Sequence, residues 1–188
     1  MKLEPDLEQK IARKAKTILE KCRPNWDWPH TLTAVYWMKQ LISENGGNER
    51  ILIPAIYFHD VGYFGLLKAG YSYRQLRKYK PLHMERGPEI VRQELADLDF
   101  TKEEIDEIAH LVAVHDLIDR KKSSIEQMVF EADCLGMIDR ERAGGGTMAE
   151  AGVKDFLNNF EKRRMPQIQS KLAREKVKGF LEKEKLSQ

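Results

Sequence analysis

The sequence predicts an all-α protein. Apolar residues recur about every 3.6 positions along nearly the whole chain, which places them on one face of successive helices. The alternation of apolar and polar residues that marks a half-buried strand is almost absent. No internal repeat or linker interrupts the pattern, so we expect one domain over residues 1–188. Its motif-bearing core should span about 25–142, followed by a C-terminal helical extension at about 148–186.

The first three helices are separated by proline and glycine. An apolar stripe predicts the first helix over residues 4–22, and Pro24 ends it. The second helix should begin near His30 and stop at residues 46–47, a pair of glycines. The third, over residues 48–58, is apolar on most sides, so we expect it to be central and buried.

Residues 61–80 form the longest stretch that the pattern leaves irregular, and they are rich in aromatic and basic side chains. Beyond them, Thr101 resembles a helix cap, because acidic residues follow it in the first turn. Helical periodicity predicts further helices over residues 82–97, 101–116, 123–142, about 148–163 and 166–186. The last two are rich in charge and carry one apolar stripe, which predicts an outer layer; a helix that forms a homodimer is the alternative.

Composition narrows the classes of function. The 32 basic and 30 acidic side chains nearly cancel, so charge gives no reason to expect binding to duplex nucleic acid. No apolar stretch approaches the roughly 18–20 residues of a membrane span, and the polar N-terminus lacks the apolar core of a secretory signal. Cys22 and Cys134 lie far apart and form no CxxC pair. We therefore expect a cytoplasmic protein without disulfides.

Histidine and aspartate residues indicate a metal site. The pair His59-Asp60 ends the most apolar helix, where an ionised carboxylate needs a partner because an uncompensated buried charge is costly. His30 lies at a helix start, and Asp133 is a polar residue in an otherwise apolar stretch. Two imidazoles and two carboxylates from separate helices suit Mn, Fe, Co, Ni or Mg with open water positions. For the His59-Asp60 pair alone, an aspartate capped by backbone or paired to an arginine is the alternative.

These residues follow the order H…HD…D, which resembles the HD-domain superfamily of metal-dependent phosphohydrolases. Residues 83–95, HMERGPEIVRQEL, are similar to that superfamily's H-x-x-x-G helix. Residues 105–116, followed by residues 130–133 (FEAD), are similar to its closing "H … A-D" segment. The likeness covers about residues 25–142 and is nearest to small bacterial and archaeal members with an H…HD…H…H…D ligand set. It implies an HD-domain helical bundle.

The resemblance also assigns roles to single residues. The residues that match the ligands of the first metal are His30, His59, Asp60 and Asp133. His83 and His115 match two further histidines, which in binuclear members help to hold a second metal bridged by Asp60. In mononuclear members their equivalents contact the scissile phosphate or donate a proton. The resemblance therefore implies a catalytic group of Asp60, His83 and His115, with one or two divalent ions (Mn, Co, Ni, Fe or Mg) as cofactor.

The implied reaction is hydrolysis of a phosphoester or pyrophosphate by a metal-bound hydroxide, which needs cationic groups near the phosphoryl oxygens. Residues 61–80 directly follow the His59-Asp60 pair, and the residues there that we expect to bind substrate are Tyr73, Arg74, Arg77, Lys78 and Lys80. Aromatic and basic side chains together suit a nucleotide, so we expect a nucleotide phosphatase or pyrophosphohydrolase. A packed lid whose cations face water is the alternative. A cyclic-dinucleotide phosphodiesterase is disfavoured, because residues 61–63 read VGY and the GYP signature is missing.

Two other functions fit the same ligand set. Some HD-fold proteins hold two irons and carry out oxygen-dependent oxidation, although the basic residues of the 61–80 segment favour phosphate. A domain that binds a nucleotide or a metal without turnover is the second alternative, and the intact ligand set argues against it.

Overall fold

A computed structural model describes residues 1–23, 25–67, 71–144 and 150–186 of the chain, and their regular structure is helical throughout, without a strand. The all-α prediction is therefore confirmed. The α-helices are α1 (Pro5–Leu19), α2 (Asp27–Asn45), α3 (Glu49–Phe58), α4 (Tyr73–Leu95), α5 (Lys102–Val114), α6 (Ser124–Ile138), α7 (Glu150–Asn159) and α8 (Lys171–Leu186). Short helical turns lie at η1 (Val61–Tyr63), η2 (Phe160–Arg164) and η3 (Met165–Gln167).

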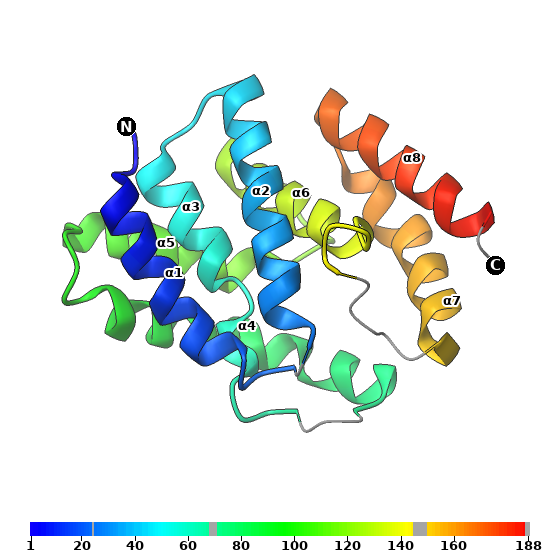
Figure 1. Cartoon of the computed structure of the whole chain (residues 1–188), viewed down its shortest axis with the longest axis horizontal. Helices are drawn as coiled ribbons and strands as arrows, with labels where there is room; N and C mark the ends of the chain where they lie inside the picture. Colours follow the sequence, from blue (N-terminus) through cyan, green and yellow to red (C-terminus); the bar gives the residue numbers. More distant parts are fainter. Residues whose placement is uncertain (24, 68–70, 145–149, 187–188) are drawn as a thin grey trace.

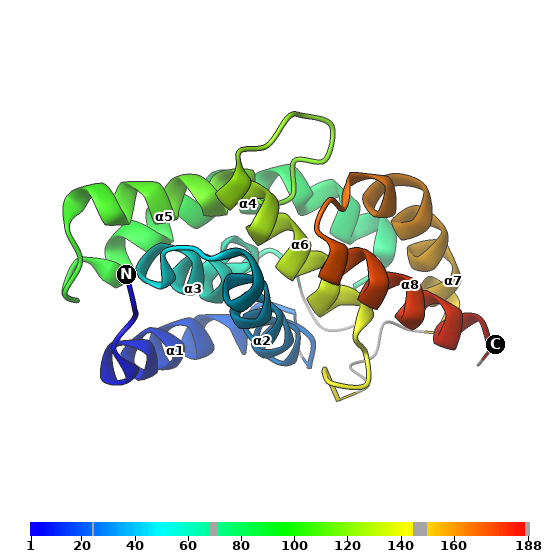
Figure 2. The ribbon, with the colours of Figure 1, turned by 90° about the horizontal axis from the view of Figure 1, so that it is seen from above.

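The helices form three layers around a buried centre (Figures 1 and 2). Helix α2 packs along α6 and α3, and these three occupy the middle. Helix α1 lies on one side of them, whereas α4 and α5 pack together on the other. Every residue of α3 from Ile51 to Phe58 is buried, as its apolar pattern predicts. Helices α7 and α8 lie at the end of the molecule away from the N-terminus.

Helix α4 corrects the boundary expected from the sequence. It begins at Tyr73, so the predicted start at residue 82 is wrong and about half of the 61–80 segment is helical. Ser72 and Gln75 form a capping box, in which the Ser72 hydroxyl accepts from the Gln75 backbone N–H and the Gln75 side chain accepts from the Ser72 N–H. Pro81 lies inside the helix. The start signal was present in the sequence, but the aromatic residues around it obscured the helical period.

The C-terminal extension is anchored to the core by a buried carboxylate. Glu131 of α6 is almost fully buried, and its Oε1 accepts hydrogen bonds from the backbone N–H groups of Gln169 (2.6 Å) and Ser170 (3.0 Å). These donors lie just ahead of α8, where helix N–H groups lack partners within the helix. Helix α8 therefore packs against α6 as an outer layer, in line with the sequence prediction.

Two glycines allow close contacts between elements that carry the histidines and aspartates of interest. A Cβ at Gly136 of α6 would lie 2.9 Å from the Ala34 Cβ of α2, so α6 and α2 approach more closely than larger residues permit. A Cβ at Gly62 would overlap the backbone carbonyl of His83. Gly62 thus brings the turn after α3 directly against α4.

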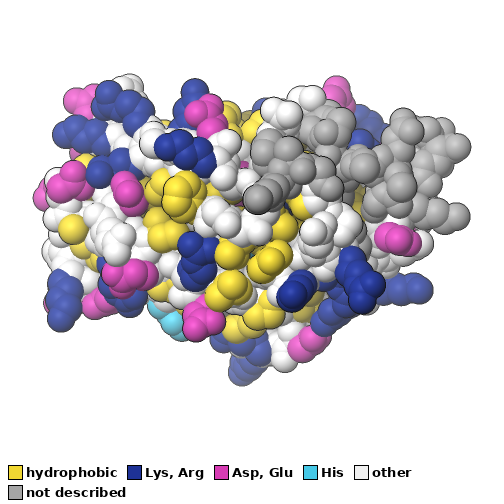
Figure 3. Space-filling view, turned by 90° about the horizontal axis from the view of Figure 1, so that it is seen from below, with side chains coloured by type: hydrophobic (Ala, Val, Ile, Leu, Met, Phe, Trp, Pro, Cys, Tyr) yellow, Lys and Arg dark blue, Asp and Glu magenta, His cyan; other side chains and the backbone are white. Residues whose placement is uncertain are grey.

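The surface gives no sign of a membrane-spanning element: among the described residues, no helix combines the length and apolar character that crossing a bilayer requires. On the face shown in Figure 3, basic and acidic side chains are interspersed around a central group of hydrophobic side chains. That face therefore carries charges of both signs, which follows from the nearly balanced charge of the chain.

Candidate metal centre

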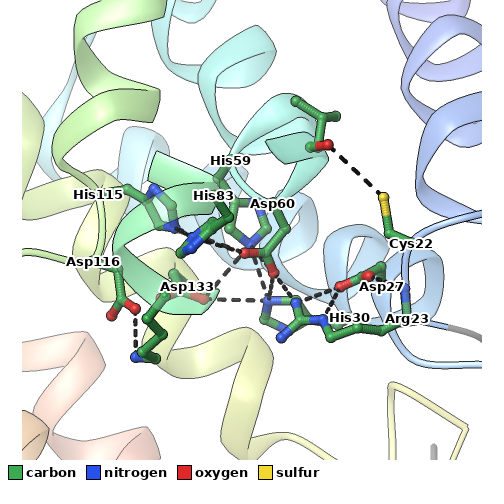
Figure 4. A network of polar contacts seen from close by, with 12 residues as sticks. Cys22, Arg23, Asp27, His30, His59, Asp60, His83, His115, Asp116 and Asp133 are labelled. Carbon is green, nitrogen blue, oxygen red and sulfur yellow. Dashed lines mark hydrogen bonds and ion pairs between the residues drawn. The ribbon is translucent and has the colours of Figure 1, made fainter. Parts of the chain in front are cut away.

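Six side chains from five parts of the fold meet in one buried cluster (Figure 4). His30 lies in the first turn of α2, and His59 and Asp60 directly follow α3. The remaining members are His83 of α4, His115 directly after α5, and Asp133 of α6. Each of them is at most 4% exposed, so the cluster is shielded from bulk water.

The first trio consists of His30, His59 and Asp133. The Nε2 atoms of the two histidines are 3.0 Å apart, and Asp133 Oδ1 lies 3.2 Å from that of His30 and 3.6 Å from that of His59. Two donors that each bind one ion at about 2.1 Å are separated by about 3.0 Å at a right angle and about 3.4 Å at a tetrahedral angle. The separations in the first trio are therefore of the size that a shared metal ion produces.

The second trio consists of Asp60, His83 and His115. The Nε2 atoms of His83 and His115 are 3.3 Å apart, and they lie 3.5 and 3.8 Å from Asp60 Oδ1. The other oxygen of the same carboxylate, Oδ2, lies 3.2 Å from His59 Nε2 and 3.6 Å from His30 Nε2. Asp60 thus faces the first trio with one oxygen and the second trio with the other.

Two of the imidazoles are oriented by backbone carbonyls. His59 Nδ1 lies 2.7 Å from the Ile56 carbonyl oxygen, and His115 Nδ1 lies 2.7 Å from that of Val112. A proton on Nδ1 donates to the carbonyl and leaves the Nε2 lone pair facing the cluster, which is the tautomer that metal binding requires. Asp116 follows His115 in the sequence but does not orient its ring. It is paired elsewhere, and the carbonyl of Val112 takes that role.

The cluster fits a divalent ion better than a closed hydrogen-bond network. Among the described residues, Asp133 Oδ1 is buried and makes no hydrogen bond, although two imidazole nitrogens are its nearest neighbours. A buried carboxylate oxygen without a partner is costly. Imidazole nitrogens and carboxylate oxygens together are the donor set of Mn, Fe, Co, Ni and Zn sites. Both trios can therefore hold a divalent metal ion.

The pKa values of His59 and His83 are shifted in opposite directions. Burial lowers the pKa of His59, but the nearby carboxylates of Asp60 and Asp133 outweigh it and raise the pKa to about 9. Burial and the neighbouring His115 instead lower the pKa of His83 to about 3. His83 is therefore neutral at physiological pH, with its ring available as a ligand. The raised pKa of His59 reflects the two buried carboxylates beside it, whose negative charge also favours a bound cation.

Two buried arginines balance part of the negative charge of the aspartates, and the sequence did not lead us to predict either of them. Arg23, between α1 and α2, pairs with Asp60 and with Asp27. Arg164, at the end of η2, donates from Nη1 to Asp133 Oδ2 (3.0 Å) and also pairs with Asp116. Burial raises the pKa of Asp60 and Asp133, but these guanidinium groups, together with the nearby histidines, hold both far below the usual range. The arginine pairing that the sequence left open for Asp60 is present, and it coexists with the ring of histidines.

A pocket opens onto the cluster from the side of the C-terminal helices. Asp60 and His115 form part of its lining, so the second trio is accessible from it. Cationic side chains lie next to them in the lining: Arg23, Lys80 and Arg164. Another part of the lining is apolar or aromatic: Trp26, Tyr63, Tyr71, Leu76, Met137, Phe156 and Phe160.

The residues expected to bind substrate are only partly gathered at this pocket. Lys80 lines it and pairs with Asp116. Arg74, Arg77 and Lys78 are exposed on α4 and do not line it. The side chain of Tyr73 lies outside the described part of the structure. Because α4 is helical, residues that are neighbours in the sequence point in different directions, and of this group only Lys80 is found at the pocket.

Comparison of the chain with protein-family models, with curated proteins and with solved structures finds no match. Evidence for the function of the chain therefore comes from the sequence motifs and from the geometry of the cluster and its pocket.

Proposed function

We propose that the chain is a divalent-metal-dependent phosphohydrolase of the HD-domain superfamily that acts on a nucleotide or a related phosphoester or pyrophosphate. The observation that carries the proposal is the position of Asp60, whose two oxygens face two different histidine-containing trios. A carboxylate between two donor sets suits a pair of divalent ions, as in many enzymes that hydrolyse phosphoesters. The order of the motifs in the sequence independently supports the same family.

The pocket supports phosphate as the group that reacts. Divalent ions, when bound, lower the pKa of coordinated water towards neutrality and polarise phosphoryl oxygens. The chain itself contributes three cationic side chains beside Asp60 and His115, namely Arg23, Lys80 and Arg164. Cations fixed in a site shielded from water stabilise charge that develops on phosphoryl oxygens much more than solvated cations do.

The remainder of the pocket supports a nucleotide over a small inorganic substrate. Aromatic side chains of Trp26, Tyr71 and Phe160 line the same pocket as the cations. Aromatic rings stack on nucleobases with little dependence on the base, and each stacked base contributes about 1–3 kcal/mol. We therefore propose that the base packs against these rings while the phosphates lie toward Asp60.

His83 and His115 have different surroundings, which bears on their roles. The Tyr63 ring covers His83, with ring centroids 4.1 Å apart and the planes at 8°, and His83 does not line the pocket. His115 does line it. We propose that both are ligands when two ions are bound, and that His115 is the one that reaches the phosphate when only the first trio is filled.

The test is an assay of phosphate and pyrophosphate release. The purified protein would be stripped of metal and given Mn, Co, Ni, Mg or Fe singly, together with a panel of nucleotides. Asp60→Asn should abolish the turnover that the metal restores. Asp99→Asn is the matched control, because the Asp99 side chain is 96% exposed and far from the cluster in the fold.

Three results would speak against the proposal. Iron-dependent oxygen consumption without phosphate release would indicate the oxidising members of the HD fold. Tight binding of a nucleotide without any product would indicate a sensor. Turnover that persists in Asp60→Asn would mean that the cluster is not the site of the reaction.

A further inference from the structure

Arg23 is held in an unusual position for a cation beside a metal cluster. It is 5% exposed and lies in the turn between α1 and α2. Its Nε donates to Asp27 Oδ1 (2.6 Å), and its backbone N–H donates to Asp27 Oδ2 (2.6 Å). The guanidinium carbon lies 4.2 Å from the centroid of the Tyr63 ring. Nη2 pairs both with Asp27 Oδ1 and with Asp60 Oδ2, so it bridges the two carboxylates.

Arg23 contacts one particular oxygen of the Asp60 carboxylate. It donates to Asp60 Oδ2, the oxygen that faces His59 (3.2 Å) and His30 (3.6 Å). A metal ion held by the first trio would lie beside this same oxygen. Arg23 thus places a positive charge next to the position of such an ion, and the two charges would repel. An arginine cannot lose its own charge by deprotonation.

Arg164 provides the contrast within the same cluster. It contacts Asp133 Oδ2, whereas Asp133 Oδ1 is the oxygen that faces the histidines. Its contact therefore leaves the inward oxygen free, and it orients the carboxylate without competing for the ion. Of the two buried arginines, only Arg23 contacts a carboxylate oxygen that also faces the histidines of the first trio.

Metal binding makes the charge around the pocket more positive. Four aspartates (Asp27, Asp60, Asp116 and Asp133) face three cationic side chains (Arg23, Lys80 and Arg164), which leaves one excess negative charge with neutral histidines. One divalent ion reverses this excess to positive. The positive charge then favours an anion in the pocket, and Arg23 lines that pocket.

We propose that Arg23 is a stand-in counter-ion for Asp60 that metal binding releases, and that the freed end of the guanidinium then binds the phosphate of the substrate in the adjacent pocket. Nε and Nη2 both contact Asp27, so metal binding breaks only the contact of Nη2 with Asp60 and leaves the guanidinium anchored to Asp27. The inference rests on the proposed function in one respect, that the pocket takes a phosphate-bearing ligand. Because binding free energies are reciprocal, metal and phosphate must then strengthen one another's binding through Arg23.

The experiment measures binding only, by calorimetric titration of metal-free protein with Mn²⁺ and of Mn²⁺-loaded protein with inorganic phosphate. Arg23→Gln should bind Mn²⁺ about tenfold more tightly than the wild type, within the range usual for coupled sites, and should bind phosphate about tenfold more weakly. Arg163→Gln is the matched control: this arginine is 46% exposed, pairs with Asp119 on the surface, and should change neither constant.

The other outcomes would overturn either the inference about Arg23 or the proposed function. Unchanged or weaker Mn²⁺ binding by Arg23→Gln would overturn the inference and leave Arg23 as a residue that only positions Asp60. Tighter Mn²⁺ binding with unchanged phosphate binding would overturn the phosphate role. Absence of Mn²⁺ binding in the wild type would instead remove the proposed metal-dependent function, so the two failures are distinguishable.

A second measurement needs no variant at residue 23 and guards against misfolding of Arg23→Gln. The side-chain NH groups of a buried, ion-paired arginine exchange slowly with water, and NMR detects them. Adding Zn²⁺, which is diamagnetic, should accelerate exchange at Arg23 Nη2 and leave Nε protected by Asp27. Equal protection of both groups before and after Zn²⁺ would contradict the release of the guanidinium.

Discussion

The ring of Tyr63 lies flat against the imidazole of His83, with centroids 4.1 Å apart and the planes at 8°, while the Arg23 guanidinium lies 4.2 Å from the Tyr63 ring centroid. One aromatic ring thus connects the second trio to the cation that pairs with Asp60. Since His83 Nδ1 has no hydrogen-bond partner among the described residues, the stacked Tyr63 ring supports the imidazole plane together with the Nε2 contacts to His115 and Asp60.

Tyr63→Leu should therefore weaken the second metal site. Leucine retains apolar volume but cannot stack, so His83 gains rotational freedom and the affinity of the second ion falls by about 10-fold, a size typical of lost outer-shell contacts. Tyr63→Phe keeps the ring and should bind both ions as the wild type does. Calorimetric titration with Mn²⁺ distinguishes the two variants, and equal affinities would show that the stacking does not matter.

The two trios should lose metal separately. His115→Ala removes a ligand of the second trio only, so we expect the number of bound ions to fall from two to one. His30→Ala removes a ligand of the first trio and should eliminate the other ion. His110→Ala serves as control, because the His110 side chain is 58% exposed and pairs with Glu126 outside the cluster. Elemental analysis after dialysis gives the counts; loss of both ions in His115→Ala would mean that the trios form one inseparable site.

Gly62 should tolerate no side chain. Its Cβ would overlap the His83 carbonyl, which belongs to helix backbone and cannot move aside alone. Gly62→Ala is therefore expected to lower the free energy of unfolding by about 3 kcal/mol or more. Gly179→Ala in α8, where nothing lies within 4 Å of the new Cβ, should raise it by about 0.5–1 kcal/mol. Urea unfolding measures both, and a small effect at Gly62 would show that the turn can shift away from α4.

Removal of Arg164 should destabilise the fold. Arg164→Gln leaves Asp116 and Asp133 buried without their shared cation, and breaking such a pair costs about 3–5 kcal/mol. Asp116 keeps Lys80 as a partner, so adding Asp116→Asn should recover only a small part of this loss. Arg163→Gln, at the exposed neighbouring position, should change stability by less than about 0.5 kcal/mol. An Arg164→Gln protein as stable as the wild type would contradict the role of its buried charge.

Glu126 should make stability depend on pH in the acid range. Burial raises its pKa, but hydrogen bonds from Arg120, the Ser123 backbone N–H and His110 lower the pKa from 4.5 to about 2. A depressed pKa stabilises the folded protein fully above pH 4.5, and the contribution is lost as the pH falls towards 2. The stability difference between the wild type and Glu126→Gln should be about 1–3 kcal/mol at pH 7 and should shrink between pH 4.5 and 2. A difference that does not vary with pH would exclude this ionised network.

The cluster of histidines and aspartates could be predicted in part because its members are polar residues in apolar surroundings. His59 and Asp60 end a helix that is buried on all sides, and Asp133 interrupts an apolar run, so each required a compensating partner. Their mutual approach depends on how α2, α3 and α6 cross, which the resemblance to the HD superfamily implied and which spacing alone does not determine.

The buried arginines could not be recognised by composition. Arg164 ends the run Glu161-Lys162-Arg163-Arg164, and such a run of charged residues is typical of a solvated helix face. The available signal was spacing: Phe156, Phe160 and Arg164 recur every fourth residue and all are buried, so Arg164 continues the apolar stripe. Arg23 carried a similar signal, an aspartate four residues later at Asp27. The sequence placed four further residues near Asp60 along the chain: Tyr73, Arg74, Arg77 and Lys78. Because α4 already begins at Tyr73, nearness to Asp60 in the sequence is a poor guide to nearness in space.

The contact between Arg164 and Asp133 also bears on where the functional unit ends. The residues that carry the motifs all precede residue 142, and a domain boundary drawn there would look complete. Such a truncated chain would lose the cation that pairs with Asp133, the aromatic rings of α7 and η2, and the segment whose backbone donates to Glu131. Helix α7 and η2 therefore form one wall of the pocket, and α8 packs against α6, so changes in these C-terminal segments should alter the pocket as well as the stability.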